Sequence, residues 1–351
     1  MNIQLSDHFN YKKLFLFTLP SVVMMVFTSV YCVVDGFFVS NFAGKTAFAA
    51  INLIMPFIMI LGGIGFMIGT GGSALVSYTL GTGDKEKANR YFSMLVYFTI
   101  LAGILLTVLG IIFVRPIAEL FGADESMMDT CVLYGRIVIA FNAAFMLQNI
   151  FQSFFVVAEK PRLGLIVTIA AGVTNMVLDA LFVGVFKWGI VGAALATGIS
   201  QSIGGLLPLL YFALPNNSPL QLTRTGFELA PLLKASSNGC SELMSNVASS
   251  LIGIMYNYQL MRLGGENAVA TYGVLMYIQF VFIAIFIGYS VGSAPIIGYH
   301  YGAGNFKELQ NMRRKSLKIM SISGVLMAIL GFTLAPVISA IFVGYDAELL
   351  S

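Results

Sequence analysis

Three acidic side chains fall inside long apolar stretches of the sequence, where they are the residues best able to bind an ion or a ligand. They are Asp35, Asp179 and Glu242, out of 16 acidic residues in the chain. A charged group near the middle of a bilayer costs roughly 2.5–3.5 kcal/mol on insertion scales, so such groups usually face a cavity or a partner. Each of the three is therefore a candidate functional residue.

Asp35 and Asp179 each lie late in an apolar stretch, and the two stretches are expected to run in the same direction. Asn175 precedes Asp179 by one helical turn and shares its face. Thr197 lies early in the next stretch, which returns in the opposite direction, so all four residues should share one depth. Two carboxylates, an amide and a hydroxyl supply the oxygen ligands that a hard cation prefers. Two neighbouring carboxylates can instead share one proton, because like charges disfavour the ionisation of both.

Each candidate also has a simpler interpretation. Asp35 could cap the end of its helix at the membrane surface, and Asn175 could form a hydrogen bond between helices. Glu242, near the middle of its stretch, could face a substrate or carry a proton, or it could pair with Asn238 or Ser241. These residue types alone leave the alternatives open.

The composition predicts an all-α integral membrane protein. Of 351 residues, 58% are hydrophobic and only 10% are charged, whereas soluble domains carry about 25% charged residues. A transmembrane helix needs about 20 apolar residues, and Pro20 should bend the first one because it lacks an N–H and its ring clashes with the preceding turn. About nine transmembrane helices are expected, near residues 14–38, 48–79, 91–114, 131–157, 163–185, 190–214, 231–260, 268–299 and 316–342.

Several classes of protein are disfavoured. The net charge of +3 indicates no nucleic-acid partner. The Gly-x-Gly loops carry neither a Walker motif nor a dinucleotide fingerprint, so they are interpreted as turns. We expect a protein that is not an enzyme and that needs no cofactor or metal.

An internal repeat sets the expected domain organisation. Gly81-Thr82-Gly83 recurs as Gly302-Ala303-Gly304, 221 residues later, and Pro116 recurs as Pro336 with an offset of 220. Parallel repeats of this kind build transporters from two similar halves. We expect a six-helix lobe over residues 1–214, a cytoplasmic linker over 215–230 and three helices of a partial second lobe over 231–351. Two units of 221 residues would make 442, which is 91 more than the chain has, so three helices of an expected twelve should lie outside it.

The sequence resembles bacterial transporters of the multidrug and toxic compound extrusion (MATE) family, in the branch of MepA-type and DinF-type proteins. The resemblance rests on the residues above and on the stretches 256–261 and 288–302. It implies a two-lobe helical bundle around a central cleft, as in the wider MOP superfamily. It also implies export of drug-like organic cations in exchange for H⁺ or Na⁺ across the bacterial cytoplasmic membrane, by alternating access.

The resemblance also assigns roles to residues. The matching cation site comprises Asp35, Asn175, Asp179 and Thr197, with Pro20 as the bend of the first helix, and Glu242 matches a substrate-facing or proton-linked acid. The alternatives are a lipid-linked or polysaccharide flippase of the same superfamily and a non-functional fragment of a MATE transporter.

The basic residues predict the orientation of the chain. With a cytoplasmic N-terminus, 14 of the 19 Lys and Arg residues fall on the cytoplasmic side, in agreement with the positive-inside rule. The other 5 fall outside, namely Lys45, Arg115, Arg136, Lys187 and Arg262.

Single cysteines test this orientation. Cysteine at position 13 or at position 315, in a cysteine-free background, should resist membrane-impermeant thiol reagents in intact cells, because both positions are expected to face the cytoplasm. Labelling should become rapid when the membrane is permeabilised. Rapid labelling of both positions in intact cells would reverse the assigned orientation.

Overall fold

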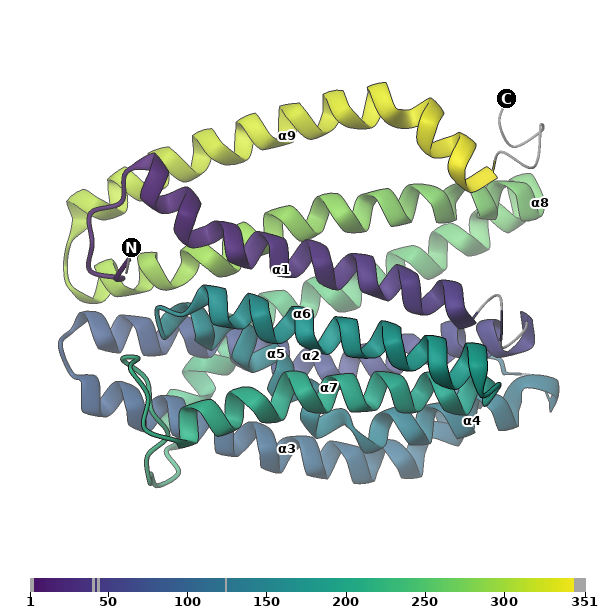
Figure 1. Ribbon diagram of the computed structural model, residues 1–351, viewed down its shortest axis with the longest axis horizontal. Coiled ribbons are helices and arrows are strands. Elements are labelled where there is room, and N and C mark those ends of the chain that lie inside the picture. Colours follow the sequence, from purple (N-terminus) through teal and green to yellow (C-terminus); the bar gives the residue numbers. More distant parts are fainter. Residues whose placement is uncertain (1–2, 40–41, 43–44, 124, 344–351) are drawn as a thin grey trace.

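The computed structural model describes residues 3–39, 42, 45–123 and 125–343, and every regular element among them is a helix (Figure 1). The helices are α1 (Tyr11–Phe38), α2 (Lys45–Gly81), α3 (Lys85–Leu120), α4 (Glu125–Ala140), α5 (Asn142–Val157), α6 (Pro161–Asp179), the π-helical η2 (Ala180–Val185), α7 (Gly189–Ala213), α8 (Leu229–Gly302) and α9 (Phe306–Val343). The all-α membrane fold expected from the composition is confirmed.

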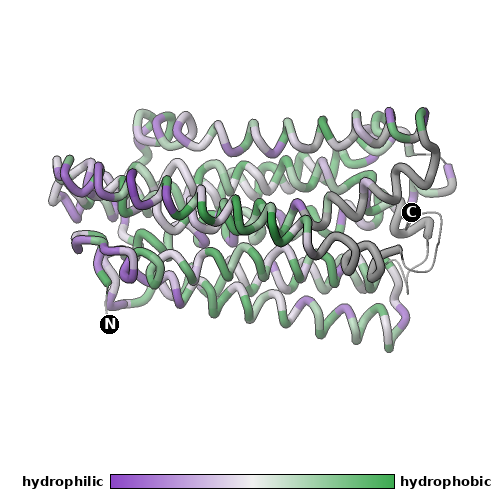
Figure 2. Tube along the Cα trace, turned by 90° about the horizontal axis from the view of Figure 1, so that it is seen from above, coloured by the Kyte–Doolittle hydropathy of each residue, from purple (hydrophilic) through white to green (hydrophobic). Residues whose placement is uncertain are grey.

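Seven of the described helical stretches are long and apolar enough to cross a membrane, or eight if the bent pair α4 and α5 counts as one span. That pair bends by 54° near Phe141, inside the span expected over residues 131–157. The expected span 231–260 is not in this count, which covers the described residues only. Figure 2 shows hydrophobic residues along the length of the helices and hydrophilic residues gathered near the end that holds the N-terminus.

α8 differs from the sequence-based expectation, which placed two separate helices in this region. Its helical backbone continues without a break from Leu229 to Gly302. The rings of Tyr256 and Tyr272 nevertheless stack with centroids 5.3 Å apart, although 16 residues of straight helix would separate them by about 24 Å. α8 therefore turns back on itself (Figure 1). Residues 229–256 are called its first arm below, and residues 272–302 its second arm.

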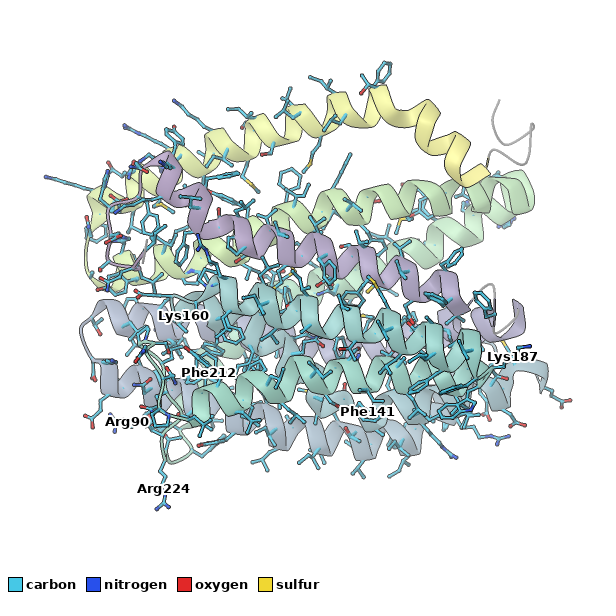
Figure 3. The ribbon with its side chains drawn as sticks, in the orientation of Figure 1. Arg90, Phe141, Lys160, Lys187, Phe212 and Arg224 are labelled. Carbon is cyan, nitrogen blue, oxygen red and sulfur yellow. The ribbon has the colours of Figure 1, made fainter. Side chains whose placement is uncertain are left out.

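The basic side chains labelled in Figure 3 are distributed unevenly between the ends of the bundle. Arg90, Lys160 and Arg224 lie at the end that holds the N-terminus, and Lys187 lies at the opposite end. The end of the bundle that holds the N-terminus is called the tail end below, and the opposite end is called the far end. The non-helical connection between α7 and α8 also lies at the tail end (Figure 1). The division of the chain into lobes at residues 215–230 stays a prediction.

α2 and the second arm of α8 make reciprocal close contacts at the tail end. A Cβ atom on Gly81 would overlap the carbonyl oxygen of Tyr299, and a Cβ atom on Gly302 would overlap the carbonyl oxygen of Tyr78. Both pairs follow the same 221-residue offset, since position 81 corresponds to 302 and position 78 to 299. The two repeats thus close against each other at this end through glycines, which alone let the backbones approach so closely.

A methyl group at either glycine should therefore force the backbones apart. Gly81→Ala and Gly302→Ala should each lower the stability of the detergent-solubilised protein by about 1–3 kcal/mol, the usual cost of overpacking, and by similar amounts. Thermal denaturation followed by size-exclusion chromatography measures this loss. Gly253 is the matched control, because it is helical and has open space where a Cβ atom would lie. Gly253→Ala should be neutral or stabilising, since alanine favours helix, and an equal loss in all three variants would contradict the explanation.

Candidate cation site and central cavity

The structure brings Asp35 of α1 and Asp179 of α6 into direct interaction. Asp179 is fully buried, with 0% of its surface exposed, and Asp35 is half-buried. Asn175, one turn before Asp179, is also buried. Two residues from distant parts of the sequence therefore place their carboxyl groups side by side in the apolar part of the bundle.

The oxygens of this group lack hydrogen-bond donors among the described residues. The unpartnered atoms are both carboxyl oxygens of Asp179, Oδ1 of Asp35, Oδ1 of Asn175 and Oγ1 of Thr197. None of the ion pairs between described residues involves either carboxyl group. Buried polar atoms in proteins nearly always have a partner, and a buried charge without one is costly. A shared proton or a bound cation would satisfy these oxygens.

Local sequence explains how α1 and α6 approach each other. Gly172 on α6 faces α1, and a Cβ atom there would lie 2.5 Å from the ring of Phe27 and 3.0 Å from the ring of Tyr31. After Asp179 the helix changes to the π-helical η2. Such π-helical turns are rare and occur frequently at functional sites.

Two further buried polar residues were not identified from the sequence. Tyr134 of α4 has 1% of its surface exposed and interacts electrostatically with both carboxyl groups. Gln201 of α7 is buried, and its Oε1 atom lacks a partner among the described residues. Gln201 follows Thr197 by one helical turn, a spacing that could have revealed it. No spacing in the sequence connects Tyr134 to either acid.

Pro20 is buried within α1, which continues through it as one helix. Its role as a bend stays a prediction.

Glu242 lies apart from the carboxyl pair and lines a cavity of ≈ 450 Å³. Asn238, named with it in the sequence interpretation, lines the same cavity. Among the described residues of the lining, Glu242 has the only charged side chain, and Phe66, Phe286, Thr70, Ser73, Ser153 and Ser290 also line the cavity. The volume falls within the range of small-molecule sites, about 300–1,000 Å³. An acid among aromatic rings can attract an organic cation.

Both arms of α8 contribute to this cavity, together with α2, α5 and α9. The cavity therefore lies between the part of the chain before residue 214 and the part after it. None of the four residues of the carboxyl-pair site lines it. Ion and substrate would occupy different places in the molecule.

A sequence model of the MatE family matches residues 20–181 and 243–351. The chain is 24% identical over 315 residues to the multidrug export protein MepA of Staphylococcus haemolyticus, an alignment that covers 89% of this chain and 68% of that protein. It is 25% identical over 308 residues to MepA of Staphylococcus aureus, with coverage of 85% and 67%.

Solved structures share the fold. An outward-facing multidrug resistance MATE family transporter of the MOP superfamily superposes with a TM-score of 0.91 at 20% identity, over 99% of this chain and 79% of that one. A MOP superfamily transporter from Pyrococcus furiosus, described as having a binding pocket of reversed polarity, gives a TM-score of 0.89 at 21% identity, with coverage of 98% and 76%.

Proposed function

Because the chain belongs to the MatE family, we propose that it is a multidrug export transporter that exchanges organic cations for H⁺ or Na⁺. The observation that carries this proposal is the pair formed by the fully buried Asp179 and the half-buried Asp35, in which both carboxyl oxygens of Asp179 and Oδ1 of Asp35 lack donors among the described residues. A site of this kind is more favourable when it holds a positive charge, so its occupancy depends on the gradient of the coupling ion. We place the protein in the bacterial cytoplasmic membrane with a cytoplasmic N-terminus.

α1 provides the physical connection between the ion site and the substrate cavity. It carries Asp35 near one end, and its middle packs against the second arm of α8, where a Cβ atom on Gly288 would lie 2.5 Å from the Cα atom of Val22. Residues 286, 287, 290, 291 and 294 of that arm line the cavity. A movement of α1 on ion binding, with Pro20 as the bend, would therefore shift a wall of the cavity.

Glu242 is the residue we assign to substrate recognition. A drug-like organic cation would place its charge near this carboxylate and its apolar parts against the phenylalanine rings. A flippase for lipid-linked sugars is the alternative from the same superfamily, and its pyrophosphate substrate would require basic groups. The described residues of the cavity lining include no Lys or Arg, which favours the cation exporter.

The coupling site is tested by removing its charges one at a time. Asp35→Asn and Asp179→Asn should each abolish ion-driven efflux of a fluorescent cation from loaded vesicles, because one carboxylate alone cannot form the shared site. Asn175→Ala and Thr197→Ala should weaken efflux without abolishing it, because each removes one neutral ligand. Membrane abundance should stay at the parental level in all four variants.

The measurement should be made over a range of pH and of Na⁺ concentration, so that the same data identify the coupling ion. If Asp35→Asn accumulates normally and exports with the parental rate and pH dependence, the proposed site is wrong. Asp35 would then be a helix cap near the membrane surface, and Glu242 would become the leading coupling residue.

Glu242→Gln should change substrate choice and leave ion coupling intact. Losing the only charge among the described residues of the cavity lining should weaken export of permanently charged cations about tenfold or more, which corresponds to about 1.4 kcal/mol. Export of uncharged amphipathic compounds should change less. Substrate competition in the same vesicles measures the difference, with Asn238→Ala as a neutral neighbour in the same lining. Equal losses for charged and uncharged compounds would argue against a recognition role.

A further inference from the structure

Residues 3–10 precede α1 without forming a helix, yet they are packed inside the tail end of the bundle. Leu5 has 1% of its surface exposed and Phe9 has 0%. Both belong to a cluster of buried residues that also contains Val156 of α5, Ile296 of α8 and Met312 of α9. The segment therefore fills space where the two parts of the chain meet.

The beginning of the segment is held by the first part of the chain. The backbone N–H of Leu5 donates to Oε1 of Glu159 at 2.7 Å. Glu159 lies between α5 and α6, with a φ of 60°, a conformation unusual for a residue other than glycine. Burial raises the pKa of Glu159 above its usual value, and the Leu5 N–H acts in the opposite direction by stabilising the carboxylate.

The end of the segment is held by α9. Oε1 of Glu308 accepts from the backbone N–H of Phe9 at 3.0 Å, and Oε2 lies 2.6 Å from Nδ1 of His8. Asn311 donates to the carbonyl oxygen of Phe9 at 3.1 Å and to Oε1 of Glu308 at 2.8 Å. Glu308 itself is buried, with 5% of its surface exposed. Both oxygens of one buried carboxylate thus bind the segment.

The side chain of Phe9 strengthens the same connection. Its ring makes edge contacts with Phe17 of α1, at 5.8 Å between centroids, and with the ring of His300 at the end of α8, at 6.5 Å. Aromatic pairs of this geometry stabilise a contact beyond the area they bury. Polar and apolar contacts therefore act together on a few residues.

From these contacts we infer that residues 3–10 form a strap that ties the α5–α6 turn to α9 and keeps the tail end closed. The inference rests on the alternating access proposed above, because a strap matters only if this end opens. Opening moves the α5–α6 turn away from α9. The strap spans both, so it must release either Glu159 or Glu308, and its strength sets how often the tail end opens.

Distances across the tail end test the strap directly. Spin labels at positions 90 and 314, both exposed, report the separation of α3 from α9 by pulsed electron resonance in lipid nanodiscs, with the native cysteines replaced. Glu308→Ala should increase the ratio of long to short distances about tenfold, because hydrogen bonds to a charged group are stronger than those between neutral groups. Glu159→Ala should act in the same direction, with a smaller change because it removes one bond.

Matched variants separate the strap from general damage. Glu159→Gln keeps an oxygen that can accept from Leu5 and should retain the parental distances. Glu308→Gln preserves the volume of the side chain and replaces one acceptor oxygen, so it should give an intermediate ratio even if Glu308→Ala folds poorly. Glu86→Ala removes an exposed glutamate at the same end and should have no effect. Because Glu159 and Glu308 hold one strap, the effect of the two alanine changes together should be smaller than the sum of their separate effects.

If Glu308→Gln and Glu159→Ala both give the same distribution of distances between the spin labels as the parental protein, the inferred strap is wrong, whatever the efflux rates of these variants are. If the distances shift in the Glu159 and Glu308 variants while Asp35→Asn and Asp179→Asn leave efflux unchanged, the strap is supported and the proposed coupling site is refuted.

Discussion

The structure depends on one unfavourable interaction, the meeting of two carboxyl groups in the apolar part of a membrane bundle. Asp179 is fully buried beside Asp35, and both of its carboxyl oxygens and Oδ1 of Asp35 have no donor among the described residues. Folding could have avoided this cost with neutral residues or a nearby Lys or Arg. An arrangement that is costly when empty and favourable when it holds a proton or a cation has the property that a coupling site needs. The π-helical turn directly after Asp179 is a second local departure from regular helix at the same place.

The consequences of occupying that site must pass along α1. This helix carries Asp35 near the far end, packs on Gly172 of α6, and contacts Gly288 and Gly292 of α8 further along its length. Small residues at these points bring helix backbones close together, so a shift of one helix cannot be absorbed by flexible side chains. The cavity around Glu242 borders the same arm of α8. The carboxyl pair and the cavity are thus separate in space and are connected by one packed helix.

The tail end is closed by two kinds of contact. The glycines Gly81 and Gly302 place backbone against backbone with the symmetry of the repeat. The N-terminal segment adds hydrogen bonds to Glu159 and Glu308. The glycine contacts depend on shape, whereas the segment depends on polar groups that water or lipid head groups could replace. The second kind of contact is therefore better suited to regulate opening.

The sequence by itself determined the class of the protein and its candidate residues. Apolar stretches of sufficient length specify membrane helices, because a backbone in lipid must satisfy its hydrogen bonds within the segment. The same constraint makes Asp35, Asp179 and Glu242 conspicuous, and the 221-residue offset is visible as recurring glycines. Only the tertiary structure decided that Asp35 meets Asp179 while Glu242 faces a separate cavity, that the two arms of α8 fold back on each other, and that Tyr134 lies near both carboxyl groups. The N-terminal segment shows the same limit, since nothing about Glu308 in the sequence indicates that it binds Phe9. Helix periodicity fixes which residues share a face within one helix, but contacts between distant helices depend on packing, to which many residues contribute small and similar amounts.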